Sequence, residues 1–483
     1  MPPDIFRVNR LRNEGWPLFH DRFNGSAFVS EPLHLSALWF NAAMIATFVN
    51  DPASLPERAI SLLGLAVMIG IAWVLSTNRR GIRWRPVLWG VGLQLLFGII
   101  VLSPELQGVF FGIVDGGVKK LLSFSEAGAD FVFQSVEPHQ IKNMAGADET
   151  FIGRISPPMK TFAFWILPTI IFFSSLMSIL YHLGLMQRVI KVIALVMQKT
   201  MGTTGPESLS AAGNIFVGQT EAPLLIAPFV EKMTRSELNA VMTGGFATVA
   251  GGVMAAYVGF LQDIPGIAGH LVTASIMSAP ASLAIAKVMV PEDGEMVDAG
   301  DVLSLTVEKV DRNVLEAAAR GASEGAKLAI NVAAMLIAFV GLIAMVDWTI
   351  GWMVLSGEPL SMSRIFGWVF SPIAFAMGVP WAEATIVGGL LGEKIVLTEF
   401  IAYIHLGEIV QSATPILSER SAVIASYALC GFANFASIGI QLGGIGGIAP
   451  SRMGDLADLS IRAMLGGCLA AFMTATVAGV LIG

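Results

Sequence analysis

Charge and cysteine are what this chain has least of. Asp, Glu, Lys and Arg make up only 13% of its 483 residues, about half the share of an ordinary soluble protein. The two cysteines, Cys430 and Cys468, both lie inside apolar runs and lack the spacing of a metal-binding pair. A disulfide framework and a structural zinc site are therefore excluded.

Several functional classes also lack their usual sequence marks. No His-Glu-x-x-His, paired-aspartate or Ser-His-Asp pattern is evident, and His405 with Glu408 is a lone pair, so the sequence does not favour an enzyme. The net charge is −7, and the segment 292–311 is a strongly acidic connector. These features argue against a nucleic-acid partner. A channel would need a continuous polar pore or a ring of charge, and neither is evident.

Apolar residues dominate instead. They form 54% of the chain, and the mean hydropathy is +0.71. Runs near twenty residues are long enough to cross the hydrocarbon of a bilayer, and they occur at about 60–77, 86–103, 161–181, 237–262, 268–290, 328–350, 420–447 and 463–482. The sequence therefore predicts an all-α polytopic membrane protein with about eight transmembrane helices.

Other apolar stretches are interrupted or amphipathic. Those at 206–230 and 364–403 are each broken near the middle by Gly, Pro and a carboxylate. We expect re-entrant hairpins there, because irregular backbone at membrane depth is tolerated only where protein or a cavity covers it. Segments that mix charge with apolar residues at helical spacing are expected to lie along the interface: 106–134, 186–200 and 312–326.

Arginines predict the orientation. Arg79, Arg80, Arg83 and Arg85 stand between the first two spans, and the positive-inside rule keeps that loop in the cytoplasm. The first hairpin then enters from the cytoplasmic side and the second from outside, which is the inverted relation expected of paired repeats. The predicted divisions are an N-terminal extension with an extra, marginal helix, scaffold helices, a first transport repeat, a scaffold helix with its loop, and a second transport repeat: 1–59, 60–182, 183–325, 326–363 and 364–483.

The functional prediction begins with a near-repeat. Residues 218–223 (GQTEAP) are answered by residues 380–385 (PWAEAT), and each is followed by a helix interrupted by glycine and polar residues. Paired interrupted units are typical of repeat-built transporters that hold a solute at the bilayer midplane. A buried Glu costs on the order of 3 kcal/mol on insertion scales, so it normally faces a cavity or a partner. Gln219, Glu221 and Glu383 are thus candidate ligands, although Glu221 as a helix cap or a partner of Lys232 is the alternative.

The two interrupted helices offer different chemistry. In the first, at 244–252, glycines leave backbone carbonyls free for a cation, and Thr248 adds a hydroxyl. Close helix packing through small residues is the alternative there. In the second, Asn434 and Ser437 are three residues apart and would share one helical face, with Phe432 as an apolar wall. These groups, without a facing Arg or Lys cluster, favour a polyhydroxylated, uncharged solute over an anion.

At these residues the chain resembles the concentrative nucleoside transporter family. The resemblance runs from about residue 60 to the C-terminus, and its motifs are residues 213–223 (GNIFVGQTEAP), 236–238 (SEL) followed by 242–248 (MTGGFAT), and 431–439 (GFANFASIG) with Gly443 and Gly444. One departure is Thr398, where the family usually has Asn. Lys394 and Glu399, in the same segment, are interpreted as an ion-pairing or capping couple. The resemblance implies a homotrimer whose scaffold holds a mobile transport domain, built from hairpins and broken helices, that works as an elevator.

The resemblance also implies the binding residues. The nucleobase would meet Gln219, Thr220 and Glu221, with Val253 packing on it, and the ribose hydroxyls would bind Glu383, Asn434 and Ser437 beside Phe432. Sodium would be held by the side chains of Asn214 and Thr248 and the carbonyls of Val217 and Val249.

The sequence thus predicts a secondary active importer of nucleosides, coupled to sodium, with an elevator mechanism. It is expected as a multi-pass homotrimer among the lipids of a bacterial inner membrane, without enzymatic activity, without a cofactor beyond the coupling cation and without a nucleic-acid partner. Two alternatives stay open: a proton as the coupling cation, as in some bacterial relatives, and another small uncharged polar solute.

Overall fold

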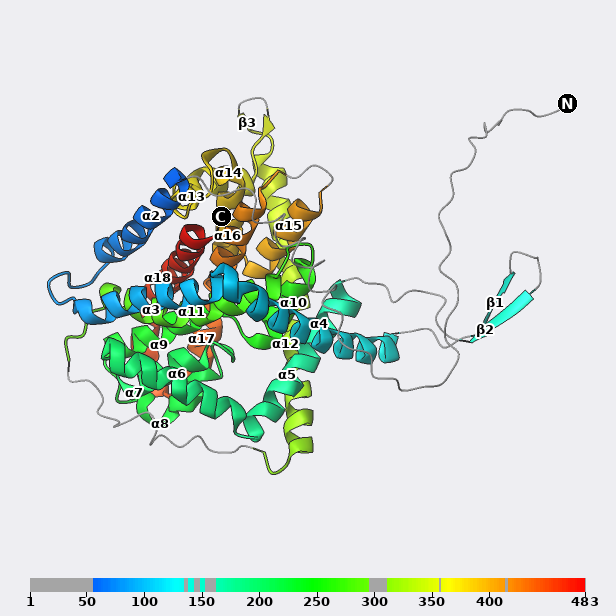
Figure 1. Cartoon of the computed structure of the whole chain (residues 1–483), viewed down its shortest axis with the longest axis horizontal. Helices are drawn as coiled ribbons and strands as arrows, with labels where there is room; N and C mark the ends of the chain where they lie inside the picture. The colour runs from blue at the N-terminus through cyan, green and yellow to red at the C-terminus, as the bar shows by residue number, and fades with distance from the viewer. Residues whose placement is uncertain are drawn as a thin grey trace. The chain divides into compact units, whose positions relative to one another are not determined.

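The computed structural model describes residues 55–133, 138–142, 148–152, 162–294, 311–355, 358–412 and 416–482 (Figure 1). The extra helix predicted within the N-terminal extension falls outside these residues. The helices before the middle of the chain are α2 (Leu55–Val74), α3 (Trp84–Leu102), α4 (Pro104–Phe133), α5 (Leu167–His182) with a π-helical turn (Phe162–Ile166) before it, α6 (Leu185–Met201), α7 (Gly205–Gly213), α8 (Ala227–Val230), α9 (Arg235–Ala247), α10 (Gly251–Phe260) and α11 (Ile267–Met289).

The second half repeats this helical character. Its helices are α12 (Val314–Ile350), α13 (Met362–Ala376), α14 (Trp381–Val396), α15 (Glu399–Gln411), α16 (Glu419–Leu429), α17 (Phe435–Ile448) and α18 (Met453–Leu481). Short 3-10 turns occur at Ala222–Ile226 (η2) and Pro450–Arg452 (η4). Two small antiparallel ribbons pair β1 (Pro138–Lys142) with β2 (Asp148–Ile152), and β3 (Val354–Leu355) with β4 (Glu358–Pro359).

The predicted spans are confirmed, with one change. Among the described residues, seven helical stretches are long and apolar enough to cross a membrane: α2, α3, the π-helical turn with α5, α9 with α10, α11, α12, and η4 with α18. The expected span at 420–447 is instead two shorter helices, α16 and α17, separated at residues 430–434. An eighth span is counted only if the pair α13 and α14, bent by 117°, is taken as one.

Two expectations for the second half were wrong in their boundaries. Residues 312–326 do not form a separate interfacial helix, because they are continuous with the following span in the 37-residue α12. The second hairpin begins later than residue 364. Gly378, with φ +100°, and Pro380 end α13, so the two arms of the hairpin are α14 and α15, and the turn between them is at residues 397 and 398.

Burial separates inner from outer helices. In the most apolar stretch of α9 with α10, and in that of α11, 89% of the residues are buried. The corresponding share is 83% in the span of η4 with α18 and only 6% in α12. Helices α9, α11 and α18 pack on one another (Figure 1). Helix α12 lies against α5, where a side chain on Gly321 or Gly325 would collide with the backbone of α5. The apolar outer face of α12 is therefore available to lipid or to another subunit.

An ion pair fixes the start of α12. Arg320 donates to both carboxylate oxygens of Asp311 at 2.8 Å and to the hydroxyl of Ser178 in α5 at 2.9 Å. These hydrogen bonds from the guanidinium hold the pKa of the Asp311 carboxyl below its usual range. The contact ties the beginning of α12 to the end of α5.

The two interrupted helices cross at their breaks. Residues 248–250 separate α9 from α10, and residues 430–434 separate α16 from α17. Gly431 has φ +121°, and a side-chain carbon there would lie 2.8 Å from the carbonyl oxygens of Phe246 and Ala247. Only glycine permits this approach, which brings the second break against the end of α9.

Candidate functional site

The first hairpin places its polar residues in an irregular turn. Asn214 is the C-cap residue of α7, and the next helical residues are those of η2, which Glu221 precedes. Within the turn, the carbonyl of Gly218 accepts hydrogen bonds from the amides of Glu221, at 3.0 Å, and Ala222, at 3.1 Å. The turn leaves Glu221 exposed and buries Gln219.

Gln219 is held by a residue that the sequence interpretation missed. The side-chain amide of Gln441, in α17, donates at 3.0 Å to Gln219 Oε1 and at 3.0 Å to the carbonyl of Met242. Gly245 faces this pair so closely that a side-chain carbon would lie 2.7 Å from Gln441 Nε2. The contact leaves the amide nitrogen of Gln219 available to a ligand. A buried glutamine in α17, where the other polar side chain is Ser437, was the signal that could have identified it.

The second hairpin contributes a buried carboxylate at its tip. Glu399, 2% exposed, is the first residue of α15. Its Oε1 accepts from the hydroxyl of Tyr257 at 2.8 Å, and its Oε2 accepts from Asn434 Nδ2 at 2.7 Å. Asn434 in turn caps α17, because its Oδ1 accepts from the amide of Ser437 at 2.8 Å. Glu399, Asn434 and Ser437 therefore form one connected polar group.

The expectation that Glu383 shares this group is wrong. Glu383 lies in the first turn of α14, and its carboxylate accepts from the amide of Ser418 at 3.2 Å and from its hydroxyl at 2.9 Å. Along the helix, it is about 20 Å from the end of α14. The carboxylate at Asn434 is Glu399, which the sequence interpretation assigned to a couple with Lys394.

Lys394 and Glu399 form no ion pair in the described part of the chain, although the two charges interact electrostatically. Lys394 is fully buried, and its Nζ donates to the carbonyls of Ala428, at 2.8 Å, and Cys430, at 3.3 Å. These carbonyls lie at the end of α16, which lacks the helical hydrogen bonds that would use them. Lys394 thus supports the break between α16 and α17. Nearby, the hydroxyl of Thr398 is buried and has no hydrogen-bond partner in the described part of the chain.

The structure changes the register of the near-repeat. Glu221 and Glu399 occupy matching places, each directly after a threonine and at the start of the second arm of its hairpin. Glu383 instead matches Glu207, because each is the third residue of a first arm. The sequence comparison of GQTEAP with PWAEAT paired the tip of one hairpin with the base of the other.

The predicted cation ligands lie in two segments that contact each other, the turn after α7 and the break after α9. The carbonyl of Phe216 accepts from the amide of Gly251 at 3.0 Å, which joins the turn after α7 to the break after α9. Thr248 closes α9, with its hydroxyl donating to the carbonyl of Gly244 at 2.9 Å. Asn214 is buried beside Gly244, and its Oδ1 has no partner among the described residues. Val217 and Val249, whose carbonyls complete the predicted set, are buried in the same two segments.

This donor set suits a hard monovalent cation. Its side chains are an amide and a hydroxyl, and the unpartnered oxygen of Asn214 is a neutral ligand. Among the residues that the structure describes, there is no cluster of three His, Cys, Asp or Glu side chains of the kind that binds transition metals. The residues present therefore fit sodium.

The remaining predicted residues surround these groups. Val253 is buried in the first turn of α10, and Phe432 is half-buried in the second break. Thr220 packs on α17, where a side-chain carbon at Gly444 would lie 3.0 Å from its methyl group. Gln219 and Asn434 are connected through α17, whose residues Asn434, Ser437 and Gln441 are spaced to share one buried face. The structure thus brings both hairpin tips to one helix.

Three sequence families match the chain. They are described as the N-terminus of Na⁺ dependent nucleoside transporters, over residues 63–136, as nucleoside recognition, over residues 163–263, and as the C-terminus of Na⁺ dependent nucleoside transporters, over residues 270–479. The chain belongs to the concentrative nucleoside transporter family. Together these matches extend across both hairpins and both broken helices.

Curated relatives support this assignment. Solute carrier family 28 member 3 of Rattus norvegicus is 42% identical over 455 residues, which are 91% of this chain and 61% of the rat protein. An uncharacterized transporter of Haemophilus influenzae is 42% identical over 433 residues, 88% of this chain and 97% of its own. The chain thus spans about three fifths of the mammalian relative and nearly all of the bacterial one. Both are transporters, in line with the prediction that the chain is not an enzyme.

Solved structures of the family share the fold. CNTnw in an inward-facing, substrate-bound state matches with a TM-score of 0.76 at 40% identity, covering 88% of this chain and 98% of that one. A doubly substituted CNTnw in an outward-facing state matches with a TM-score of 0.77 at 40% identity, covering 88% and 97%.

Proposed function

We propose that this concentrative nucleoside transporter imports nucleosides by symport with sodium. The observation that carries the proposal is the pair of polar groups at the two hairpin tips: Glu399 with Asn434, and Gln219 with Gln441. Both lie where two broken helices cross, and neither includes a facing cluster of cations. An uncharged solute with hydroxyls at one end and an amide-like edge at the other matches such a site.

Each group has a distinct role in this mechanism. Glu399, held by Tyr257 and Asn434, keeps further lone pairs that accept from ribose hydroxyls, and Ser437 adds a hydroxyl beside it. At the other end, Gln219, with Thr220 and the exposed Glu221, offers donors and acceptors to the edge of the base. Val253 and Phe432 provide apolar surface for the rings. Because Glu399 and Gln219 are already hydrogen-bonded, little ordering is required when substrate binds.

Sodium is co-transported at the adjacent site of Asn214, Val217, Thr248 and Val249. The unpartnered Oδ1 of Asn214 supports this assignment, since a buried polar oxygen without a partner is costly unless a ligand satisfies it. The turn that carries Gln219 follows Asn214 directly. Sodium binding therefore favours the arrangement of the turn that binds substrate, which couples the two affinities.

Movement follows from the division between inner and outer helices. In this proposal, the scaffold is formed by residues 60–182 and 326–363, and the transport repeats, 183–325 and 364–483, carry the site across the bilayer as an elevator. The exposed apolar face of α12 supports a homotrimer, in which that face meets neighbouring subunits or lipid. The bacterial relative supports a place in the inner membrane of a bacterium.

Transport into proteoliposomes tests the function. Purified protein is reconstituted, and uptake of labelled uridine and adenosine is measured under a sodium gradient, under a proton gradient alone and with neither. We expect accumulation only with the sodium gradient. Accumulation driven by protons alone would contradict the sodium assignment and favour the proton as the coupling cation. Absence of accumulation in all arms would contradict a nucleoside as the substrate.

A further inference from the structure

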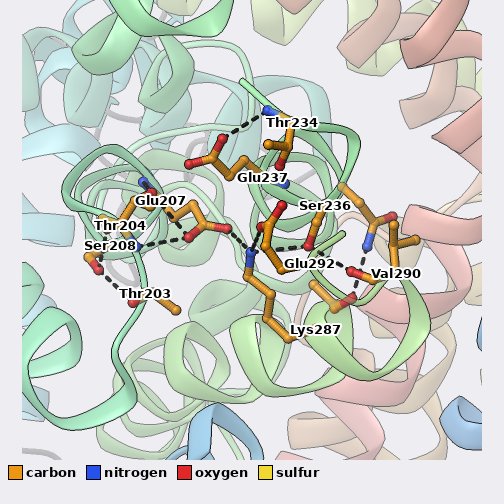
Figure 2. Close-up of polar contacts among 12 residues, drawn as sticks. Thr203, Thr204, Glu207, Ser208, Thr234, Ser236, Glu237, Lys287, Val290 and Glu292 are labelled. Carbon is orange, nitrogen blue, oxygen red and sulfur yellow. Dashed lines mark hydrogen bonds and ion pairs between the residues drawn. The ribbon is translucent and has the colours of Figure 1, made fainter. Parts of the chain in front are cut away.

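A buried lysine connects three elements at the ends of α7 and α9 that lie opposite the proposed sodium site. Lys287 lies in the last turn of α11 with a side chain that is 7% exposed, and it pairs with Glu207 of α7 (Figure 2). The same ammonium pairs with Glu292 at 3.0 Å and donates to the hydroxyl of Ser236, in α9, at 3.1 Å. One cation thus holds the beginnings of α7 and α9 against the end of α11.

Further contacts make this junction rigid. Glu207 and Glu237 each form a reciprocal capping box, with Thr204 and Thr234 respectively, so the first turns of α7 and α9 are fixed (Figure 2). The hydroxyl of Ser236 also donates to the carbonyl of Val290 at 2.7 Å. Lys287 therefore acts on helix ends that cannot adjust independently.

Net stability does not explain the charges. Removing ionised groups from water costs about as much as their mutual attraction returns, and well-packed apolar residues of similar volume often stabilise as well or better. Glu292 Oε1 is even buried without a hydrogen-bond partner among the described residues. A directional contact that fixes the relative position of helices is the best-attested use of such groups.

Both helices that Lys287 holds end at the proposed sodium site. Helix α7 runs from Glu207 to Asn214, a rise of about 10 Å, and α9 runs from Ser236 to Thr248, a rise of about 18 Å. A regular helix transmits an axial shift at one end to the other, because its backbone hydrogen bonds resist stretching. The contacts of Lys287 thus set how far the side-chain oxygens of Asn214 and Thr248 lie along their helix axes relative to each other.

We infer that Lys287 is a positioning residue for the sodium site: by holding the starts of α7 and α9 together, it sets the separation of Asn214 from Thr248. This inference rests on the proposed function. It predicts that loss of the lysine weakens sodium binding specifically, while the nucleoside groups, which are also held by α15 and α17, keep their geometry once sodium is saturating.

The test compares Lys287→Met with Lys199→Met, a control at an exposed lysine in the last turn of α6. The sodium concentration for half-maximal uridine uptake and the KM for uridine at saturating sodium are measured in proteoliposomes. Groups that contact a metal ligand directly typically change metal affinity by about 10- to 100-fold. Lys287 acts on the ligands through two helices, so Lys287→Met should raise the half-maximal sodium concentration by about tenfold, the lower end of that range. Its KM at saturating sodium, and both values for the control, should not change.

Two further variants separate positioning from folding. Lys287→Met with Glu207→Gln removes both members of the pair, so no carboxylate is left facing the lost ammonium in α7, and Ser236→Ala removes only the hydroxyl contact to α9. Both variants should need more sodium for half-maximal uptake than the unsubstituted protein, and the increase should be smaller in Ser236→Ala. Sodium alone should raise the unfolding temperature of each purified protein. This rise should be largest for the unsubstituted protein, smaller for Ser236→Ala and smallest for the two lysine variants.

Each opposing result is decisive. Three results would overturn the inference. The first is a folded Lys287→Met protein with an unchanged sodium requirement, and the second is a loss of uridine affinity at saturating sodium that equals the loss of sodium affinity. The third is that the lysine variants do not fold while Ser236→Ala folds and has an unchanged sodium requirement. If uptake by the unsubstituted protein does not depend on sodium, the proposed function fails first, and the role of Lys287 fails with it.

Discussion

The two hairpins carry the same pattern and use it differently. Each has a Thr-Glu pair at its tip and a glutamate in the first turn of its first arm. At the tips, Glu399 is buried with two side-chain partners, whereas Glu221 is exposed and its carboxylate accepts from the amide of Gly218 at 3.4 Å. The comparison teaches that one hairpin presents a carboxylate held by two side chains, while the other presents an exposed carboxylate that no described side chain holds by a hydrogen bond.

The bases of the hairpins differ in the opposite sense. Glu207, in the first hairpin, is fully buried and pairs with Lys287, whereas Glu383, in the second, is half-exposed and bonds to the capping hydroxyl of Ser418. The first hairpin is therefore anchored by an ion pair at its base, and the carboxylate at its tip is exposed. The second is fixed at its tip and more lightly held at its base.

Removing the anchor of the first hairpin should have the largest effect on stability. Lys287→Met leaves Glu207 and Glu292 buried without their cation, and breaking a buried pair typically costs about 3–5 kcal/mol of unfolding free energy. Thermal unfolding in detergent would show a much lower transition temperature. Glu383→Gln is the control at the base of the second hairpin, and an equal loss in both variants would remove the difference between the two bases.

Glu399→Gln should have the largest effect on transport. The change removes the charge from the hydrogen bonds with Tyr257 and Asn434, and charge-assisted bonds are worth about 1.5–3 kcal/mol each, so uptake at low uridine should fall by about 100-fold. The measurement is initial uptake under a sodium gradient. Glu383→Gln should transport normally, and the reverse outcome for the two variants would restore Glu383 as the ribose ligand.

Gln441→Leu should weaken binding at the base-recognition end. It leaves the buried carbonyl oxygen of Gln219 without its donor, at a cost of about 1–3 kcal/mol, so the KM for uridine should rise by about tenfold. Gln94→Leu is a matched control, because Gln94 is a buried glutamine in α3 that bonds to Met277 and Thr474 instead. A raised KM in both variants would mean that the effect is general and not specific to Gln219.

Ser418→Ala should have the smallest effect. Loss of the hydroxyl removes its donation to Glu383 and its acceptance from the amide of Ser421, whereas the backbone amide of residue 418 still donates to Glu383. Loss of such an N-cap side chain typically costs about 1 kcal/mol of stability. A modest fall in unfolding temperature with normal uptake is expected. Lost uptake in a stable Ser418→Ala protein would show that the base of the second hairpin takes part in transport.

Local patterns were sufficient for much of the fold and for half of the site. The seven apolar spans, the interrupted helices at 244–252 and 430–439 and the polar turn after Asn214 were all predictable, since each depends on hydropathy or on glycine within one short segment. The carboxylate of the second hairpin was not predictable in this way. Glu383 and Glu399 both lie in an apolar, interrupted stretch, and only the position of the hairpin turn decides which one reaches Asn434.

The sequence by itself determined that this protein crosses the membrane, where its helices break and which segments carry polar groups, because length, hydropathy and glycine content act within a segment. The tertiary structure alone decided which of those groups meet. Asn434 and Glu399 are 35 residues apart, Gln219 and Gln441 222, and Glu207 and Lys287 80. Such contacts depend on how helices pack against one another, and a local pattern of residues does not determine that packing.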